Sequence, residues 1–589
     1  MIKKTFTRHE MPKTHRTPDM DSRVRKTTRP VGPTGSENAV RFIPLGGLEE
    51  IGRNCSFFEY KNEIVIVDVG IQFPEESTPG VDYIIPNVTY LEAKKKNIQA
   101  IILTHGHYDH IAAIHYLIEK LGNPIIYTSE FTRAIVEKRH AEFTNAPKLK
   151  FITVKDGDRV KISENFTAEF FVVEHTIPQA YGFLLETPAG NMASFGDFRI
   201  DYTKEGVPQH LEIFDRVGKK GIHTAFMDST NADIAGHVPS EETVEANLEM
   251  LIKNAKGRII IATFASLVDR LLEIIKIADR LGRKIAVNGR SMKDNLEIAK
   301  SLGYLKERKD HVIPLEDINK HRDDKIIILT TGAQGEANAG LMRIVNGEHR
   351  VVRLKQTDTV VFSSSVVPGN ERSVQSLQDN IARQVDEIYN SKLLDIHASG
   401  HVHAEDIKLV LQRVKPKFII PIHGYYFKRK SYQKLAAEAG LKRDSVIMMD
   451  NGQVAELTPN SLLVTKETVP AFYVMVDGLG VGDVKEIVLQ DRLTLAKEGM
   501  VVIIMTIDRN KGGLLKNPDI ISRGFIHLKE NQGVLEDIRK RVRGLFSRLP
   551  NNRSPENDYL KTLIRDQIGQ FLYNKTRRRP MILSVVIEI

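Results

Sequence analysis

The feature that most constrains this chain is a short apolar run that ends in a dense cluster of metal-binding side chains. Residues 101–103 predict a buried strand. Three histidines and one aspartate follow it within a few positions: His105, His107, Asp109 and His110. Imidazole nitrogen and carboxylate oxygen are ligands that Zn²⁺ and Mn²⁺ accept. Alternate spacing lets His105 and His107 point to one ion while Asp109 and His110 face a second, so we favour a metal centre over a solvated histidine-rich loop.

Other predicted strands end in the same kind of residue. His175 follows the apolar run 170–173, Asp197 follows 192–195, and His423 follows 418–422. Layered α/β folds carry their sites at the ends of strands. We therefore expect these side chains to meet the first cluster.

Composition limits the class of protein. A chain of 589 residues is too long for one core and predicts about three or four domains. Its 41% hydrophobic and 27% charged residues are typical of a soluble globular protein. No apolar run reaches the roughly 18 residues that span a bilayer, and the basic N-terminus lacks the apolar segment of a signal peptide. Cys55 is the single cysteine, which excludes an intrachain disulfide and fits a reducing cytoplasm. We expect a cytoplasmic protein without a membrane partner.

The N-terminal segment differs from the rest of the chain. Residues 1–38 contain nine Lys and Arg against four Asp and Glu, so they supply +5 of the net charge of +9. The segment is rich in Pro, Thr and Ser and shows no apolar periodicity. We interpret it as a disordered basic arm. It either attracts a polyanion or only keeps the protein soluble.

Alternating strands and helices dominate the middle of the chain, up to about residue 380. Short polar loops close several of these strands, at 263–266, 288–291, 331–336 and 363–365. Backbone N–H groups and hydroxyls in such loops can bind phosphate at a helix N-terminus. Any one loop also fits plain turn geometry, but several at one sheet edge predict a track for a polyphosphate.

The ligand order His-x-His-x-Asp-His, then His175, Asp197 and His423, resembles that of the metallo-β-lactamase superfamily. The insert between Asp197 and His423 resembles the β-CASP domain of its nucleic-acid-processing branch. Further motifs resemble the ribonuclease J family, at 45–54, 175–178, 196–198, 228–231, 331–336, 363–371, 397–401, 476–483 and 518–524. This resemblance covers nearly everything from Val40 onward.

The resemblance implies an α/β fold in which an αββα metallo-β-lactamase sandwich carries an inserted doubly wound β-CASP domain and a small α/β C-terminal domain. The implied boundaries are a first sandwich segment at 39–230, the β-CASP domain at 231–380, a second sandwich segment at 381–450, a linker at 451–470 and the C-terminal domain at 471–589.

The resemblance also implies a role for each ligand. His105, His107 and His175 would hold one divalent metal. Asp109, His110 and His423 would hold the other, and Asp197 would bridge both. Zn²⁺ is favoured, with Mn²⁺ or Mg²⁺ as alternatives. Asp109 could also orient the attacking water. His401 would lie near the leaving oxygen, where imidazole can donate a proton, and Asp228 would brace the metal histidines.

The implied substrate is RNA, degraded 5′→3′ from a 5′-monophosphate end with additional internal cleavage, in RNA decay and maturation. The implied RNA contacts are Phe264, Ala265, Ser266, His397, Ala398, Ser399, Gly400 and His401. His397 could equally support its loop, and His115 and His403 are expected to be structural or exposed. A homodimer or homotetramer is implied, and a structural Ca²⁺ could be held by Asp68, Gly70 and Asp477.

Departures from the family pattern leave alternatives open. Gln179 stands where the family usually has Asp, and Leu267 where it has Asn, which puts substrate affinity and 5′-end preference in question. Residues 111–113 read Ile-Ala-Ala where Ile-Gly-Gly is usual.

The alternatives are a non-catalytic RNA-binding paralogue and a β-CASP nuclease that acts on DNA. The complete ligand set argues against the first, and the C-terminal motifs argue against the second. A lactamase or thioesterase has no use for the large insert.

Overall fold

The computed structural model describes residues 38–75, 77–305, 311–367, 369–478, 480–484, 486–508, 513–526, 532–548 and 557–589. The chain divides into two compact units: the first runs up to Gln72 and continues over Ile85–Tyr473, and the second comprises Phe73–Ile84 and Val474–Ile589. The arm expected over residues 1–38 lies outside the described residues apart from Asn38. Within these ranges, no helix is long and apolar enough to cross a membrane.

Two β-sheets form the centre of the first unit. One has eight strands in the order β20-β19-β1-β2-β3-β5-β6-β7. They are β1 (Val40–Gly46), β2 (Cys55–Tyr60), β3 (Glu63–Val67), β5 (Ile98–Ile102), β6 (Ile125–Thr128), β7 (Lys150–Thr153), β19 (Gln453–Thr458) and β20 (Ser461–Thr468). The other has six strands in the order β18-β12-β11-β10-β9-β8. They are β8 (Arg159–Lys161), β9 (Thr167–Val172), β10 (Tyr181–Thr187), β11 (Gly190–Ser194), β12 (Ile222–Asp228) and β18 (Phe418–Ile422).

The two sheets pack face to face through one apolar core. Phe42 and Phe58 of the eight-stranded sheet meet Phe226 of the other, and the ring centroids of Phe42 and Phe226 lie 4.4 Å apart. Aromatic pairs of this kind add to the stability that area burial gives. This core fixes which strand ends of the two sheets lie beside each other.

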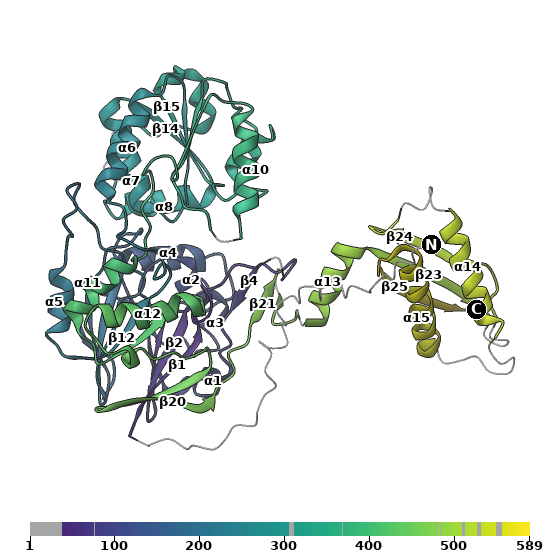
Figure 1. Ribbon diagram of the computed structural model, residues 1–589, viewed down its shortest axis with the longest axis horizontal. Coiled ribbons are helices and arrows are strands. Elements are labelled where there is room, and N and C mark those ends of the chain that lie inside the picture. Colours follow the sequence, from purple (N-terminus) through teal and green to yellow (C-terminus); the bar gives the residue numbers. More distant parts are fainter. Residues whose placement is uncertain are drawn as a thin grey trace, which may run out of the picture. The chain divides into compact units, whose positions relative to one another are not determined.

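Helices cover the outer faces of both sheets. On the six-stranded sheet, α5 (Glu212–Gly218), α11 (Ala404–Val414) and α12 (Tyr426–Glu438) share a second apolar core with the strands (Figure 1). The parallel strands β3, β5, β6 and β7 are connected through α1 (Thr89–Ala93), α2 (Tyr108–Ile111), α3 (Ile114–Leu117) and α4 (Glu130–His140). Because the other sheet covers the inner face, these connections can only lie on the outer one. The result is the expected αββα sandwich.

The inserted domain has a sheet of its own, drawn in teal at the top of the first unit in Figure 1. Its five strands are all parallel, in the order β14-β15-β13-β16-β17. They are β13 (Ile259–Ala262), β14 (Lys284–Asn288), β15 (Ile326–Thr330), β16 (Thr359–Phe362) and β17 (Glu387–Asn390). The helices are α6 (Glu241–Asn254), α7 (Val268–Leu281), α8 (Arg290–Ser301), α9 (Gly340–Val345) and α10 (Glu371–Ala382).

Sequence explains why this sheet is parallel and doubly covered. The central strands are continuous runs of Ile, Leu, Val and Ala in which every residue of β13, β15 and β16 is buried. Such runs are typical of strands with helices on both faces. Since all strands are parallel, the loops at 263–266, 288–291, 331–336 and 363–365 follow strand ends on one edge of the sheet.

The second unit contains two small sheets. One has the order β22-β21-β4, with β4 (Tyr83–Ile85), β21 (Val474–Asp477) and β22 (Gly480–Val481). The other has the order β24-β23-β25, with β23 (Met500–Ile507), β24 (Asp519–Arg523) and β25 (Met581–Glu588). The helices are α13 (Glu486–Glu498), α14 (Gln532–Phe546) and α15 (Asn557–Thr576). The segment around β4 joins this unit through a hydrogen bond of 2.9 Å from Asp82 N to Val476 O.

Candidate metal centre

The seven expected ligands come from strand ends and one short helix of the sandwich. They are His105 and His107 after β5, Asp109 and His110 in α2, His175 after β9, Asp197 after β11 and His423 after β18. The structure brings all of them together in two adjacent groups, one of three histidines and one that contains both aspartates. The two sheets supply ligands from opposite sides, which is why residues so far apart in sequence meet.

The first group has the spacing of a metal site. His107 Nδ1 lies 3.1 Å from His105 Nε2 and 3.1 Å from His175 Nε2. Ligand atoms about 2.0–2.1 Å from a tetrahedral Zn²⁺ are about 3.3 Å apart. Three ring nitrogens that face one another at this distance therefore fit a shared cation.

The second group mixes imidazole and carboxylate. His110 Nε2 lies 3.1 Å from Asp197 Oδ2, and His423 Nε2 lies 3.1 Å from Asp109 Oδ2. Asp197 also connects the groups, because its Oδ2 is 3.9 Å from His105 Nε2 in the first group. This position suits a bridging carboxylate.

Outer partners fix the orientation of the ligand rings. His175 Nδ1 is 2.7 Å from the carbonyl oxygen of Gly400, and His110 Nδ1 is 2.8 Å from Asp68 Oδ2. Asp68 also accepts from the backbone N–H of Thr104 at 2.8 Å. A metal histidine usually has such a partner on its second nitrogen, which sets the tautomer. The role of Asp68 was missed from the sequence, although it directly follows the buried strand β3.

Electrostatics differ between the two groups. Burial lowers the pKa of His107 to about 4, and burial together with neighbouring imidazoles lowers the pKa of His105 and His175 well below their usual value. In the second group burial also acts to lower the pKa. Nearby carboxylates outweigh it, with Asp197 making the largest contribution, and raise the pKa of His110 and His423 well above the usual value. The same residue type is thus tuned in opposite directions across one centre.

His401 lies beside the centre and is held by Asp228. Its Nδ1 is 2.8 Å from Asp228 Oδ2, and its ring centroid is 5.6 Å from that of His423. Burial acts to lower the pKa of His401, but Asp228 raises it above the usual value. Asp228 was expected to brace the metal histidines. Its closest imidazole partner is instead His401, and its Oδ1 lies 3.9 Å from Nδ1 of the metal histidine His423.

The loop at 397–401 packs directly on the metal centre. A Cβ on Gly400 would lie 2.7 Å from His175 Cε1, so only glycine allows the close approach of its carbonyl. Ser399 Oγ accepts from the backbone N–H of His401 at 3.1 Å and from Asn231 Nδ2 at 2.8 Å. Ala398 is buried, whereas His397 is half-buried and its Nδ1 has no hydrogen-bond partner among the described residues.

The remaining expected RNA contacts lie in the inserted domain. Phe264, Ala265 and Ser266 are half-buried and follow β13 at the edge that carries the polar loops. Asn295 Nδ2 donates to Ala265 O at 2.8 Å. Within the described chain, no hydrogen bond or ion pair joins these three to the metal ligands, so their role stays a prediction.

Two of the departures from the family pattern, Gln179 and Leu267, have structural positions that the sequence did not predict. Gln179 has a positive φ of 57° and accepts from the backbone N–H of Phe131 at 3.0 Å, at the start of α4. Leu267 is buried and occupies the N-cap position of α7, with no side-chain cap. Asn is a favoured N-cap residue, so the exchange removes a helix cap at this position.

The histidines set aside in the sequence lie apart from the ligands. His115 is buried and stacks on Phe143, with ring centroids 5.0 Å apart. His403 begins α11, and its backbone N–H donates to Asp406 Oδ2 at 3.0 Å.

The proposed calcium ligands do not form a metal group in the described part of the chain. Asp68 is used by His110 and Thr104, and Asp477 pairs with Arg492 in the second unit. A Cβ on Gly70 would collide with the carbonyl oxygen of Asp109, which indicates that this glycine serves close backbone packing. The calcium site stays a prediction.

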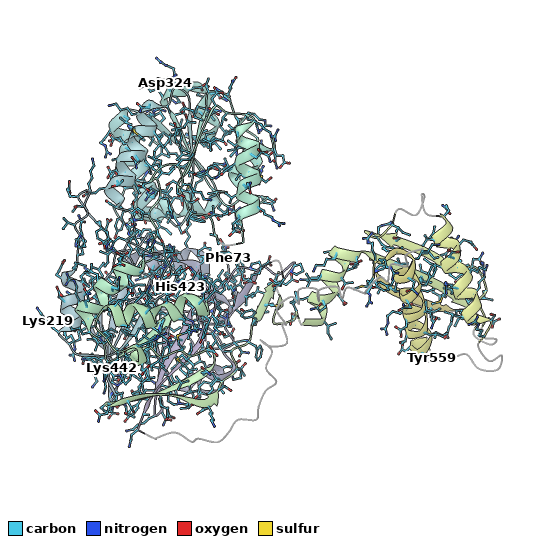
Figure 2. All side chains as sticks on the ribbon, viewed as in Figure 1. Phe73, Lys219, Asp324, His423, Lys442 and Tyr559 are labelled. Atoms are coloured by element: carbon cyan, nitrogen blue, oxygen red, sulfur yellow. The ribbon has the colours of Figure 1, made fainter. Side chains whose placement is uncertain are left out.

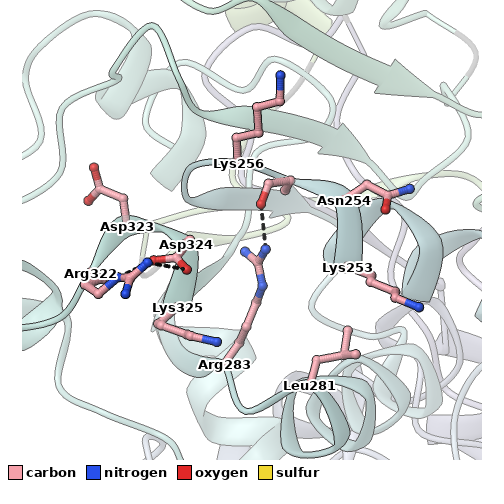
Figure 3. Close-up of a pocket in the computed structure, with 10 residues that line it drawn as sticks. Lys253, Asn254, Lys256, Leu281, Arg283, Arg322, Asp323, Asp324 and Lys325 are labelled. Carbon is pink, nitrogen blue, oxygen red and sulfur yellow. Dashed lines mark hydrogen bonds and ion pairs between the residues drawn. The ribbon is translucent and has the colours of Figure 1, made fainter.

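A cavity of about 690 Å³ lies at the other edge of the inserted sheet (Figure 3). It is lined by the ends of α6 and α7 and by residues that precede β15. Arg283 donates to the carbonyl oxygen of Ala255 at 2.7 Å, and Arg322 pairs with Asp324. Figure 2 shows Asp324 at the far end of the first unit from His423. The cavity is therefore separate from the metal centre, and its buried arginine serves to satisfy backbone carbonyls.

Comparisons with known proteins agree with this fold and site. Residues 48–204 match the family model of the metallo-beta-lactamase superfamily, and 390–448 match the Zn-dependent metallo-hydrolase RNA specificity domain. The chain is thus a metallo-β-lactamase-type hydrolase that binds divalent metal. Residues 256–381 match the Ribonuclease J beta-CASP domain and 487–589 the Ribonuclease J C-terminal domain.

Similar proteins extend over almost the whole chain. Ribonuclease J2 of Bacillus subtilis is 34% identical over 93% of this chain and 99% of its own length. Ribonuclease J 1 of Streptococcus pyogenes is 36% identical over 93% of this chain and 98% of its own length. Ribonuclease J of Mycobacterium tuberculosis is 34% identical over 95% of this chain and 99% of its own length. A solved structure of a protein of unknown function from Enterococcus faecalis shares the fold, with a TM-score of 0.50, 15% identity, and coverage of 71% of this chain and 100% of that one. The chain belongs to the ribonuclease J family, whose members are metal-dependent ribonucleases.

Proposed function

We propose that this chain is a two-metal ribonuclease that degrades RNA 5′→3′, prefers a 5′-monophosphate end and also cuts internally, in RNA decay and maturation. The observation that carries the proposal is the convergence of two ligand groups, joined by Asp197, beside a histidine that can carry a proton. His105, His107 and His175 would hold one cation, and Asp109, His110 and His423 the other. The nitrogen-rich first group favours Zn²⁺, with Mn²⁺ or Mg²⁺ as alternatives.

When bound, two divalent cations acidify water and neutralise charge on the attacked phosphate. The residues of the chain supply the rest. Asp109, whose side chain is 25% exposed, can accept a hydrogen bond from the attacking water and orient it. His401 keeps its proton through Asp228, so it can protonate the leaving oxygen near neutral pH.

The inserted domain would hold the RNA. Its polar loops at 331–336 and 363–365 offer hydroxyl and backbone N–H groups on one sheet edge, which suits a terminal phosphate. The contacts expected at Phe264–Ser266 and His397–His401 would position the backbone so that the scissile bond lies over the cations.

We also propose that the protein forms homodimers or homotetramers through its second unit. The sheet β24-β23-β25 packs one face on α14 and α15, and its other face exposes Ile521, Leu583 and Val585. An exposed apolar sheet face is typical of an interface. Sedimentation analysis of the full chain would test this assembly.

End-labelled RNAs with 5′-monophosphate, 5′-triphosphate or 5′-hydroxyl ends test the activity, with a DNA of the same sequence as control. Mononucleotides released mainly from the monophosphate RNA are expected, together with slower internal fragments from all three. Equal cleavage of DNA would favour the alternative β-CASP nuclease. No cleavage, with fewer than two bound metals per chain, would favour the non-catalytic paralogue.

A further inference from the structure

Two aromatic side chains open helix α12, immediately after the metal ligand His423. Tyr426 and Phe427 have 49% and 59% of their surface exposed. Single exposed aromatics are common on proteins. Two consecutive aromatic rings that are about half exposed and lie beside a metal centre suggest a ligand.

Contacts place Phe427 close to the centre. Thr230 Oγ1 lies 3.0 Å from His423 Nδ1, and the carbonyl oxygen of Thr230 accepts from Lys428 Nζ at 2.7 Å. The same Nζ lies 5.6 Å from the centroid of the Phe427 ring. The ring is therefore separated from a metal ligand only by Thr230 and Lys428.

Basic residues gather at the start of α12, where Arg429 Nη2 also lies 3.9 Å from Glu49 and 3.8 Å from Asp450. Lys428 is mostly buried and Lys430 is exposed on the same helix start. The first turn of α12 contains no acidic residue, so the positive end of the helix dipole is not offset there. Asp233 is the carboxylate that meets Lys428, at 2.9 Å, and it leaves the exposed Lys430 available.

The two rings and the loop at 397–401 reach the centre through different ligands. The carbonyl oxygen of Gly400 contacts His175, in the first ligand group. Thr230 contacts His423, in the second group, and Lys428 contacts Thr230. His401 stands between them, with ring centroids 5.4 Å from His175 and 5.6 Å from His423. RNA that runs from the loop across the cations would meet α12 beyond the scissile bond.

We propose that Tyr426 and Phe427 form a stacking platform, the α12 platform, for RNA bases on the 3′ side of the scissile bond. The inference rests on the proposed function, because it takes the 5′ end to lie in the inserted domain. Aromatic faces stack on any base, so the platform adds affinity without sequence preference. The exposed Lys430 would hold an adjoining phosphate.

Binding of a 5′-monophosphorylated decanucleotide and dinucleotide tests the platform, using the full metal-loaded chain in a His401→Ala background. The double variant Tyr426→Leu/Phe427→Leu removes both rings but keeps apolar bulk. Stacking on aromatic rings is worth about fivefold to a hundredfold in affinity per base. We expect the Kd of the decanucleotide to rise at least about fivefold and that of the dinucleotide, which ends before α12, to stay unchanged.

A matched variant and a modified RNA separate stacking from damage to the fold. Tyr426→Phe/Phe427→Trp keeps both rings and should bind the decanucleotide as the parent does. Decanucleotides with a single abasic position should show one or two positions at which the parent loses affinity and the leucine variant does not.

Unchanged decanucleotide binding in the leucine variant would overturn the platform, and so would equal weakening of both RNAs. The proposed function is judged separately, because it fails only if the unmutated chain does not cleave RNA.

Discussion

The two ligand groups use the same ring but in different surroundings. The first group is three histidines whose pKa values burial lowers, and its outer partners are a backbone carbonyl and the Thr104 hydroxyl, 3.1 Å from His105 Nδ1. The second group contains two aspartates, and its outer partner on His110 is a third carboxylate, Asp68. Neutral partners leave an imidazole neutral, whereas carboxylates stabilise its protonated form.

Cation binding should therefore displace fewer protons from the first group, whose imidazoles have lowered pKa values, than from the second, where carboxylates raise the pKa values of His110 and His423. Asp197 lies in the second group, and its Oδ2 is 3.9 Å from His105 Nε2 of the first, so its loss should affect the centre more than the loss of a ligand near one group only.

Asp197→Ala should therefore have the largest effect. It removes the carboxylate that reaches both groups, and we expect both metals to be lost from the purified protein and RNA cleavage to fall more than about a thousandfold. Metal analysis and single-turnover cleavage measure the two effects. His107→Ala is the comparison variant, since its ligand lies in the first group only. Two tightly bound metals in the Asp197 variant would refute the bridging role.

His401→Ala should have the second-largest effect on the cleavage rate. His401 is not one of the seven expected ligands, so its loss should remove the proton donor and leave the metals in place. A proton donor contributes about a hundredfold to ten-thousandfold to the rate. We expect the rate under saturating RNA to fall within this range while both metals remain bound. A full rate at neutral pH would assign the proton transfer to another group, and loss of one metal would make His401 a ligand.

Asp68→Asn should weaken one group only. The amide keeps the size of the side chain but removes the charge that faces His110 Nδ1. Loss of an outer partner typically costs about tenfold to a hundredfold in metal affinity. Competition with a chelator should show one weakened site and one unchanged site. Two equally weakened sites would mean that Asp68 supports the whole fold of the loop rather than His110.

Most of the centre could be predicted from sequence because its ligands follow apolar runs. His105 to His110 form one local pattern, and a buried strand that ends in His or Asp is a strong signal at 175, 197 and 423. The sheet of the inserted domain could also be predicted from the sequence, since its runs of Ile and Leu are typical of parallel strands.

Partners defined by three-dimensional packing could not be predicted. Asp68 entered only as a possible calcium ligand that the family resemblance implied, and nothing in the sequence shows that its carboxylate faces His110. The Gly400 carbonyl carries no side-chain signal at all, yet it contacts His175. The segment 73–84 joins the second unit through β-pairing with a strand far later in the chain, and such pairing leaves no local pattern. Leu267 was identified only as a departure from the family pattern, because its capping position depends on where α7 begins.

The pH dependence of metal binding is the smallest expected effect and the most direct test of the comparison. Because the pKa values of His110 and His423 are raised, these rings are protonated below their raised values and a cation must displace the protons. The affinity of the second group should therefore rise as the pH increases through neutrality towards these raised values. His107, with a pKa lowered to about 4, is already neutral over this range, so the affinity of the first group should stay nearly constant.

Calorimetric titration in two buffers of different ionisation enthalpy counts the protons released at each step. Release on binding to the second group alone is expected, whereas equal release at both steps would show that the carboxylates do not divide the centre in this way.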